Sequence, residues 1–394
     1  MNGRDCPEKL STMPLKIANI VLDGRFAGPQ NRILLVAERL KKYGIETIVI
    51  IPRIDSEIFY RKLVQKNIQT KRMNLHRLTK HIPHLIGWLL FFIPELISLY
   101  KFLKRENITL VHCNTSWQIK GILAGKMARA KVIWHLQDTR ASPAIKTLFK
   151  ILAYLVCDGF IVAGASVRHY YFDSEWLNKK TIVEIQAPVD TSHFNPNAPM
   201  KDKTIVKNSR INITSVGNIN PNKGFEYFIE MAKILNKKYK NLSFYIVGPY
   251  LETQKRYWRR LNQLVHKCGL RNLSFYGQSH NVPSVLQATH IFVCSSVTEA
   301  SPMAVWEAMA MEKAVVSTNV GDVRRFIRNG KSGFIVPPAD ACQLAQKVSI
   351  LIDDCNLRKR IGKSARATVV KELDIEVCAD KHRDFYAQYL GMKQ

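Results

Sequence analysis

The sequence predicts an α/β protein made of two doubly wound parallel-sheet domains. Short apolar runs of strand length alternate with stretches of helical periodicity, and this series occurs twice along the chain. Between the two series, a Pro- and Asn-rich polar stretch at residues 188–203 has the composition of a linker. The 394 residues, 46% of them hydrophobic, suffice for two folded domains. A disordered chain is excluded, because it would contain far fewer apolar side chains.

The first series opens the chain with a strand, a loop and a helix. The helical pattern is expected to end at Gly44, because glycine is the usual residue just after a helix. The expected strands are residues 17–22, 46–51, 108–113, 131–135 and 159–162, and the expected helices are residues 31–43, 117–128 and 143–156.

The second series begins after the linker and is more regular. Its expected strands are residues 211–216, 242–247, 273–276, 290–293, 314–317 and 333–336. The clearest helices between them are residues 223–236 and 302–311, and helices at residues 341–352, 357–371 and 375–389 close the chain. We therefore predict an N-terminal domain over 1–200, a second domain over 201–374, and a C-terminal helix over 375–394 that packs back toward the first. Two such domains are expected to face a cleft, where ligands bind near the carboxyl ends of the strands.

The charge of the chain is unusually positive and unevenly spread. Lys and Arg number 59 against 31 Asp and Glu, a net charge of +28, which implies nucleic acid, anionic lipid or a phosphorylated substrate as partner. Residues 61–150 hold 17 basic and three acidic residues, half of the net charge, beside an apolar stretch at 85–99. Basic residues next to Trp, Phe and Leu are typical of contact with an anionic membrane surface. The alternative is a buried helix with a solvated basic face, and the two are compatible.

No membrane-spanning or secreted class is expected from the sequence. The apolar stretch is shorter than the roughly 20 residues of a spanning helix, and Pro94 and Glu95 interrupt it. Residues 1–16 lack the apolar core of a signal peptide. The eight cysteines are scattered without C-x-x-C spacing, which argues against zinc and favours a reducing compartment. We expect a cytoplasmic protein, peripheral on the membrane face.

Residues 291–327 carry the most chemical information. An apolar strand ends at Ser295 and Ser296, Glu299 follows in a turn, and Pro302 is expected to open a helix at its first turn. Backbone N–H groups near the start of that helix, at Ala300, Ser301, Pro302 and Met303 (proline itself offering none), can hold a diphosphate. Glu307 follows eight residues after Glu299, in that helix, and a carboxylate near the start of the helix can accept two hydrogen bonds from vicinal hydroxyls such as those of ribose. The alternative is a helix whose acidic first turn only complements the helix dipole.

An ordered series of segments resembles glycosyltransferase family 4, a family of retaining enzymes with the GT-B fold of two Rossmann-like domains. The spacing of Glu299 and Glu307 matches the E-x7-E spacing of these enzymes. The resembling segments are VHCNTSW, WHLQD, IQAPVDTSHFNP, SVGNINPNKGFEYFIEMAKIL, FYIVGPY, LSFYGQSHNVPSVLQATHIFVCSS, EASPMAVWEAMAM with AVVSTNVGD, and RNGKSGFIVPPAD. The resemblance covers nearly the whole chain and implies a hexosyltransferase that uses a nucleotide-diphosphate sugar.

The resemblance implies roles for individual residues of the second domain. Glu307 would hold the ribose hydroxyls, Glu299 would lie beside the transferred sugar, and Lys223 would bind the diphosphate. The family usually has Arg after the glycine of this loop, but here Asn218 follows Gly217. A second departure is Asp322, which stands where the family has the second glycine of a pair.

In the first domain, the resemblance implies two donor-facing residues. His135, at the end of a strand, would be the sugar-facing histidine and act in catalysis. Gly28 would let the N-terminal loop approach the donor closely. Acceptor-side roles for Asp138, Arg140 and Arg25 are hypotheses, and plain surface charge explains these residues equally well.

The implied reaction is a transfer with retention of configuration, in which the leaving diphosphate helps take the proton of the acceptor hydroxyl. No D-x-D triplet occurs, so we expect no metal and no cofactor, with Lys223 and helix N-termini offsetting the leaving-group charge. The acceptor is expected to be a lipid-linked or cell-envelope glycan precursor. A nucleotide-sugar epimerase or a phosphorylase-like enzyme of the same fold is the alternative. Nucleic acid is not expected as a partner, because no aromatic-interleaved basic sheet or recognition helix is apparent.

Overall fold

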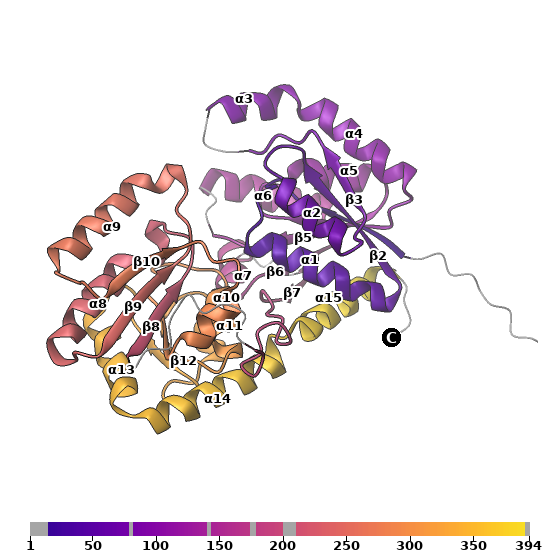
Figure 1. The fold of residues 1–394 in the computed structure, drawn as a ribbon. Helices are drawn as coiled ribbons and strands as arrows, with labels where there is room; N and C mark the ends of the chain where they lie inside the picture. The colour runs from indigo at the N-terminus through magenta and orange to yellow at the C-terminus, as the bar shows by residue number, and fades with distance from the viewer. Residues whose placement is uncertain (1–14, 79–81, 140–142, 174–178, 200–209, 391–394) are drawn as a thin grey trace, which may run out of the picture. The chain divides into compact units, whose positions relative to one another are not determined.

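The computed structural model describes residues 15–78, 82–139, 143–173, 179–199 and 210–390 (Figure 1). The chain forms two compact units, and these are Met1–His135 with Leu148–Phe160 and Arg383–Gln394, and Leu136–Thr147 with Ile161–His382. We call them the first and the second unit. The domain boundary predicted at residue 200 lies outside the described residues, so the predicted domain limits stay a prediction.

A seven-stranded sheet, most of it in the first unit, has the order β3-β2-β1-β4-β5-β6-β7. Its strands are β1 Leu15–Ile20, β2 Ile45–Pro52, β3 Thr70–Met73, β4 Leu110–Asn114, β5 Lys131–Leu136, β6 Gly159–Val162 and β7 Thr181–Glu184. Strand β1 pairs in parallel with both β2 and β4. The five predicted strands are confirmed. The two that sequence analysis missed, β3 and β7, form the edges of the sheet, where a strand needs no continuous apolar run.

The second unit contains a six-stranded sheet of order β10-β9-β8-β11-β12-β13. Its strands are β8 Ile211–Val216, β9 Leu242–Val247, β10 Leu273–Gly277, β11 Ile291–Cys294, β12 Ala314–Thr318 and β13 Phe334–Val336. All neighbouring strands pair in parallel. These are the six strands that the sequence predicts, each within two residues, so the doubly wound α/β prediction is confirmed.

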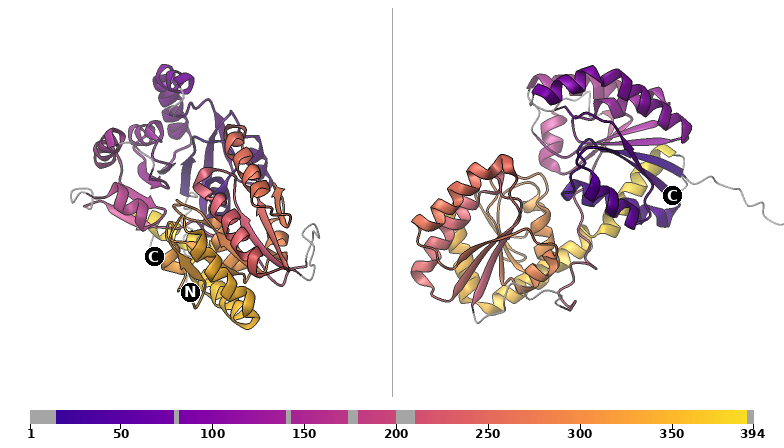
Figure 2. Two further views of the ribbon diagram at one scale, coloured as in Figure 1. Left: turned by 90° about the vertical axis from the view of Figure 1, so that its left-hand side faces the viewer. Right: turned by 45° about the horizontal axis from the view of Figure 1, so that its top comes forward.

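Helices cover both faces of each sheet (Figures 1 and 2). They are α1 Gly28–Leu40, α2 Glu57–Gln65, α3 Ile82–Leu90, α4 Phe92–Arg105, α5 Ile119–Met127, α6 Pro143–Val156, α7 Ala165–Tyr171, α8 Phe225–Lys238, α9 Lys255–Lys267, α10 Val282–Ala288, α11 Met303–Ala310, α12 Val323–Phe326, α13 Ala341–Asp353, α14 Cys355–Glu372 and α15 Ile375–Leu390. Gly44 ends the first helical segment in the left-handed region, at φ 69°, as predicted. Among the described residues, no helix combines the length and apolar character that crossing a bilayer requires.

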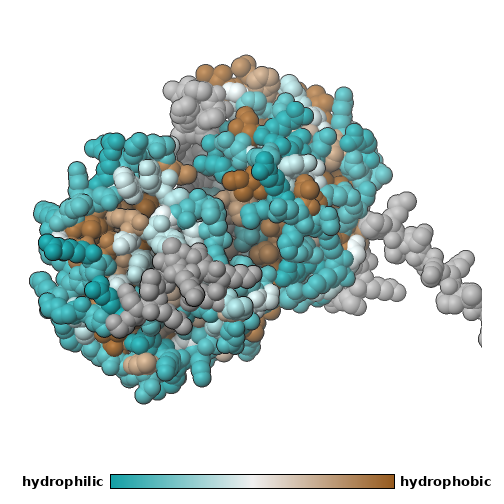
Figure 3. Space-filling model, viewed as in Figure 1, coloured by the Kyte–Doolittle hydropathy of each residue, from teal (hydrophilic) through white to brown (hydrophobic). Residues whose placement is uncertain are grey.

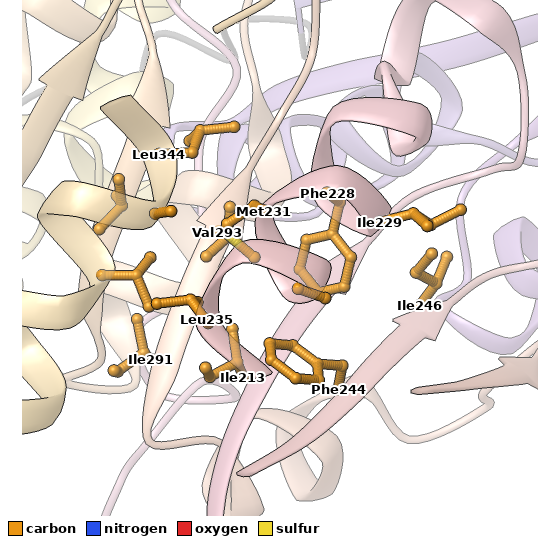
Figure 4. Packing of buried hydrophobic residues seen from close by; sticks show 14 of the residues in the cluster. Ile213, Phe228, Ile229, Met231, Leu235, Phe244, Ile246, Ile291, Val293 and Leu344 are labelled. Carbon is orange, nitrogen blue, oxygen red and sulfur yellow. The ribbon is translucent and has the colours of Figure 1, made fainter. Parts of the chain in front are cut away.

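The core of the second unit follows from the alternation of side chains along its strands. In β11, Ile291 and Val293 join a cluster with residues of α8 and α13, whereas Phe292 packs on the other face with α11 and α14. Figure 4 shows the first cluster, in which the rings of Phe228 and Phe244 meet edge to face with centroids 6.2 Å apart. This sheet, buried on both faces, fixes the loops that follow its strands.

The stretch predicted as a linker is bound along much of its described length. The backbone of Val189 bonds to Leu373 and Ile375, and the Arg366 guanidinium donates to the carbonyl of Phe194. These contacts lie within the second unit, so residues 188–199 are packed against the segment that joins α14 to α15. A polar, Pro-rich composition therefore predicted the absence of helix and strand here, but not the tight attachment.

Candidate active site

Most of the predicted site residues of the second unit lie on the loops after β8 and β11, the two strands at which the order of the second sheet reverses. Ligands of doubly wound sheets bind at this position, beyond the carboxyl ends of the strands. Gly217 follows β8, and a Cβ placed on it would lie 2.8 Å from Cε of Lys223. The glycine therefore leaves room for the Lys223 side chain across the strand end. A short 3₁₀ turn, Pro221–Lys223, and Gly224 at φ 56° complete the loop before α8.

Glu299 is held in the loop after β11 by contacts with the β8 loop. The backbone of Val297 donates to the carbonyl of Asn222 at 2.8 Å, and the Ser295 hydroxyl donates to the carbonyl of Lys223 at 3.0 Å. The Ser296 hydroxyl donates to Oε1 of Glu299 at 3.0 Å. The two loops are thus bound to each other before any ligand is considered, so the Glu299 carboxylate is pre-positioned.

Lys223 and Glu299 form an ion pair at this junction. Nζ of Lys223 lies 2.6 Å from Oε1 of Glu299, and both side chains are mostly buried, with exposed fractions of 22% and 17%. Burial lowers the pKa of the Lys223 amine, but the carboxylates of Glu299 and Glu307 outweigh that effect and raise its pKa above the ordinary value. The amine is therefore a cation at neutral pH, held on the Glu299 carboxylate.

Glu307 lies on α11 close enough to Lys223 for each charge to affect the other. Burial raises the pKa of Glu307 to about 7, and the charge of Lys223 opposes this shift. A carboxyl group that titrates near neutrality in a partly buried position needs hydrogen-bond donors for its charged form. Vicinal hydroxyls of a ribose supply such donors, which fits the predicted role.

The start of α11 differs in detail from the prediction. Pro302 stands at the N-cap, one residue before the helix, and not in the first turn. The Met303 amide donates to the carbonyl of Ser301 at 3.0 Å, so it is engaged within the loop. The Ser301 hydroxyl accepts from the indole of Trp306 at 3.2 Å. Ala300 lies beside the turn at Gly321, whose φ is 52°. Any anion binding by this segment stays a prediction.

The two departures from the family pattern have different structural settings. Asn218 is exposed, and its carbonyl accepts a hydrogen bond from the side chain of Asn220. Asp322 is buried and accepts from the Ala165 amide at 3.1 Å and from Gln186 at 3.2 Å. Asp322 therefore replaces a glycine with a structural contact to α7, and no donor-binding role is needed to explain it.

The predicted donor-facing residues of the first domain lie in the first unit. Gly28 is the first residue of α1, and His135 stands near the end of β5 with no exposed surface. Both ring nitrogens of His135 are occupied, Nε2 by Arg32 at 2.6 Å and Nδ1 by His112 at 3.1 Å. A sugar hydroxyl would have to take the place of the Arg32 guanidinium to reach this ring. The role of His135 stays a prediction.

The acceptor-side hypotheses gain little from the structure. Arg25 is exposed and forms an ion pair with Asp23, which also contacts Arg77. Asp138 is half-buried after β5, and Arg140 lies outside the described residues. Exposed ion pairs of this kind contribute little to stability, so surface charge remains sufficient to explain Arg25.

Several polar residues that are hydrogen-bonded to Glu299 or His135, directly or through one another, were not identified from the sequence. These are Ser296, Arg32, His112, Asn114 and Tyr386. One signal existed for two of them. Asn114 ends β4 and pairs in register with His135 near the end of β5, and His112 lies two residues before Asn114, on the same face of the strand. Among the described residues, no group of three or more His, Cys, Asp or Glu side chains is arranged to hold a metal ion.

Comparison with known proteins agrees with this architecture. The family described as Glycosyl transferases group 1 matches residues 198–368, and the family described as Glycosyltransferase Family 4 matches residues 26–193. The fold is similar to that of HepE from Anabaena, solved in complex with UDP, with a TM-score of 0.82 over 95% of this chain and 100% of that one, at 17% identity. The chain belongs to glycosyltransferase family 4 and has the GT-B fold. It is a glycosyltransferase, as the sequence predicts.

Two curated relatives act on lipid-linked glycans according to their names. UDP-Gal:alpha-D-GlcNAc-diphosphoundecaprenol alpha-1,3-galactosyltransferase of Escherichia coli is 25% identical over 308 residues, covering 74% of this chain and 78% of that protein. GalNAc-alpha-(1->4)-GalNAc-alpha-(1->3)-diNAcBac-PP-undecaprenol alpha-1,4-N-acetyl-D-galactosaminyltransferase of Campylobacter jejuni is 22% identical over 234 residues, covering 59% and 61%. The relatives therefore include enzymes of glycan assembly.

Proposed function

We propose that this enzyme transfers a sugar from a nucleotide-diphosphate donor to a hydroxyl of a lipid-linked glycan precursor, with retention of configuration, at the cytoplasmic face of a membrane. The proposed binding of the nucleotide-sugar donor rests on one observation, the ion pair of Lys223 and Glu299 between the loops after β8 and β11. A diphosphate is negatively charged, and the mostly buried amine of Lys223 is a cation that can bind it.

The proposed chemistry uses Lys223 and Glu299 in succession. On donor binding, the amine of Lys223 moves from Glu299 to the diphosphate, and Glu299 turns to the sugar hydroxyls as a hydrogen-bond acceptor. As the bond between sugar and diphosphate breaks, the cation stabilises the charge that develops on the leaving group. The leaving diphosphate takes the proton of the acceptor hydroxyl, and the new bond forms on the face it leaves. No metal is part of this proposal.

The acceptor proposal rests on the named activities of relatives and on the first unit's surface. The Escherichia coli and Campylobacter jejuni relatives are named for diphosphoundecaprenol and PP-undecaprenol substrates. Large apolar side chains are exposed along α3 and α4, and these are Leu85, Ile86, Leu89, Leu90, Phe91, Ile93 and Ile97. Figure 3 shows brown, hydrophobic residues along the top of the molecule, where Figure 1 places these helices. We propose that this surface, here called the α3–α4 surface, contacts an anionic bilayer.

Charge complements the apolar side chains of the α3–α4 surface. Lys101, Lys104 and Arg105 are exposed on the last turns of α4, and residues 61–150 carry half of the net charge of the chain. Basic residues beside apolar ones bind anionic lipid by electrostatic attraction together with burial of the apolar side chains. The buried Glu95, which binds Lys120 and the backbone of His76, ties α4 to the rest of the first unit.

Turnover assays with a panel of UDP-, GDP- and ADP-sugars test the proposed reaction. With a polyprenyl-diphosphate glycan as acceptor, we expect a product whose anomeric configuration matches that of the donor, and we expect EDTA to leave the rate unchanged. An inverted product would contradict retention. Rapid epimerisation of the nucleotide sugar without acceptor, or release of a sugar phosphate on adding inorganic phosphate, would support the epimerase or phosphorylase alternative.

Flotation with anionic liposomes tests the membrane proposal. We expect the wild type to float at low salt, and the double variant Leu89→Gln/Leu90→Gln to float several-fold less, because it loses roughly 2–4 kcal/mol of apolar burial. Ile54→Gln is a matched control, since Ile54 is equally exposed but lies outside α3 and α4. Equal flotation of the double variant and the control would contradict a role for the α3–α4 surface.

A further inference from the structure

A second concentration of positive charge lies in the second unit, in the segment that contains most of α8 and all of α9. Residues 233–271 include ten Lys and Arg and a single acid, Glu252. Residues 61–150 carry half of the net charge of +28, and this shorter segment carries most of the other half. The positive charge outside the first segment is therefore concentrated in one place and not spread evenly over the chain.

Most of these cations are exposed and have no ion-pair partner. Lys238 pairs with Asp353 and Lys255 pairs with Glu252, and no other ion pair involves the ten among the described residues. Glu230 is an exposed acid on the preceding turn of α8. The eight exposed, unpaired cations, here called the α8–α9 surface, are Lys233, Lys237, Lys240, Arg256, Arg259, Arg260, Lys267 and Arg271.

Helical spacing places the unpaired cations of α9 on one side of that helix. At about 100° per residue, the three arginines and the lysine lie within an arc of about 100°. The other side of α9 is committed to the core, because Tyr257 and Leu261 belong to the buried cluster that also contains α8 and α13. The basic side of α9 is therefore the side that a partner can reach.

The cations of α8 and α9 form one continuous surface. The two helices pack side by side over the same face of the second sheet (Figures 1 and 2). The side-chain amides of Asn236 and Asn272 bond to each other at 2.8 and 3.0 Å, which fastens the last turn of α8 to the loop after α9. Lys237 follows the first of these asparagines and Arg271 precedes the second, so the two rows of cations adjoin there.

The extent and composition of the α8–α9 surface favour a lipid surface as its partner. A small anion needs cations that converge on one point, whereas these are spread along about 20 Å of helix. Two apolar side chains are exposed in the same segment, Ile234 at 37% and Leu251 at 47%. Apolar side chains among cations gain from a layer of lipid headgroups, but a soluble polyanion offers them nothing.

We propose that the α8–α9 surface binds an anionic bilayer, with lipid phosphates lying on the cations of α9. This contact is separate from that of the α3–α4 surface, because α3 and α4 belong to the first unit and α8 and α9 to the second. It rests on electrostatic attraction, since the apolar side of α9 is buried in the protein. It is also independent of the sugar-transfer chemistry.

Two triple variants of the full chain, each with three fewer positive charges in the second unit, test the proposal. Both are made in the Leu89→Gln/Leu90→Gln background, so that the α3–α4 surface does not mask the effect. The α9 variant is Arg256→Gln/Arg259→Gln/Arg260→Gln. The α14 variant is the matched control and replaces three exposed cations of that helix, Lys359→Gln/Arg360→Gln/Lys363→Gln.

The measurement is the partition coefficient onto vesicles of phosphatidylcholine mixed with phosphatidylglycerol at low salt. We expect it to fall about 10- to 100-fold in the α9 variant and less than about threefold in the α14 variant, because only the former loses cations at the lipid contact. Binding by the background chain should also weaken steeply at about 0.5 M salt, where exposed charges are screened. Arg259→Gln alone should show a smaller loss, so the test does not depend on the folding of the triple variant.

Four results would overturn the proposal. The first is equal partitioning of the α9 and α14 variants, and the second is equal binding to vesicles of phosphatidylcholine alone. The third is the absence of binding by the Leu89→Gln/Leu90→Gln background, which would leave the α3–α4 proposal standing. The fourth is retention on a soluble anionic polysaccharide without binding to anionic vesicles, which would assign the α8–α9 surface to a glycan.

Discussion

The two polar clusters of this chain differ in how they are built. Lys223, Glu299 and Glu307, which we propose bind the donor and here call the donor cluster, come from two adjoining loops and a helix of the second unit, and their charged groups are partly exposed. The histidine cluster of the first unit comes from α1, β4, β5 and α15, and it is fully buried. Its hydrogen-bonded members are Arg32, His112, His135 and Tyr386. The first arrangement suits binding of a charged ligand, because its ion pair can exchange partners. The histidine cluster, in contrast, is suited to holding its own side chains in a single arrangement.

Glu299→Ala breaks the donor cluster at its centre and has the largest expected effect. Transfer should fall by about a thousandfold, because the sugar loses its acceptor and Lys223 loses the group that positions it. Steady-state assays with purified variants measure this, with circular dichroism to verify folding. Glu252→Ala is the control, since that side chain is 75% exposed and forms an exposed ion pair with Lys255, three residues further along the chain. Wild-type turnover by Glu299→Ala would show that the assignment is wrong.

Glu307→Gln removes the charge of this side chain and keeps its shape, so it tests the effect of the buried carboxyl group on stability. Between about pH 4.5 and 7 the folded chain keeps a proton on Glu307 that the unfolded chain has released. The free energy of unfolding of the wild type therefore falls as pH rises through this window, and the Gln variant lacks this loss. We expect the variant to gain about 1–2 kcal/mol relative to the wild type between pH 4 and pH 8, since the side chain is partly exposed.

Urea unfolding at several pH values measures this difference. The same variant should bind the nucleotide about tenfold more weakly, because an amide offers ribose one acceptor oxygen in place of two. Parallel stability curves for wild type and variant from pH 4 to pH 8 would mean that the Glu307 carboxyl is not buried in the native protein.

Sequence reasoning succeeded where a short stretch of chain determines the structure. The second sheet is buried on both faces, so its strands are mostly apolar and can be recognised from the sequence. The edge strand β3, with the sequence TKRM, carries no such signal because Met73 is the only one of its four residues that is buried. The α3–α4 surface has a clear apolar signal, but that signal has two interpretations. Apolar residues indicate either burial in the protein or contact with lipid, and the sequence alone does not distinguish between them.

The same contrast holds for the candidate site. Lys223, Glu299 and Glu307 stand within family motifs, so their proximity was expected, although the direct ion pair was not. The contact of His112 with Tyr386 joins residues 274 positions apart, and no local pattern marks either one. Only the parallel register of β4 and β5, which brings Asn114 beside His135, could have suggested part of this cluster.

We propose that Lys223, held by Glu299 between the loops after β8 and β11, binds the diphosphate of the donor. Isothermal titration of the wild type and of Lys223→Ala with UDP, GDP and ADP measures this binding. Lys233→Ala, an exposed change on α8, serves as the control. We predict that the favoured nucleotide binds Lys223→Ala about 10- to 100-fold more weakly than the wild type or the control. Equal affinity in all three proteins would contradict the claim.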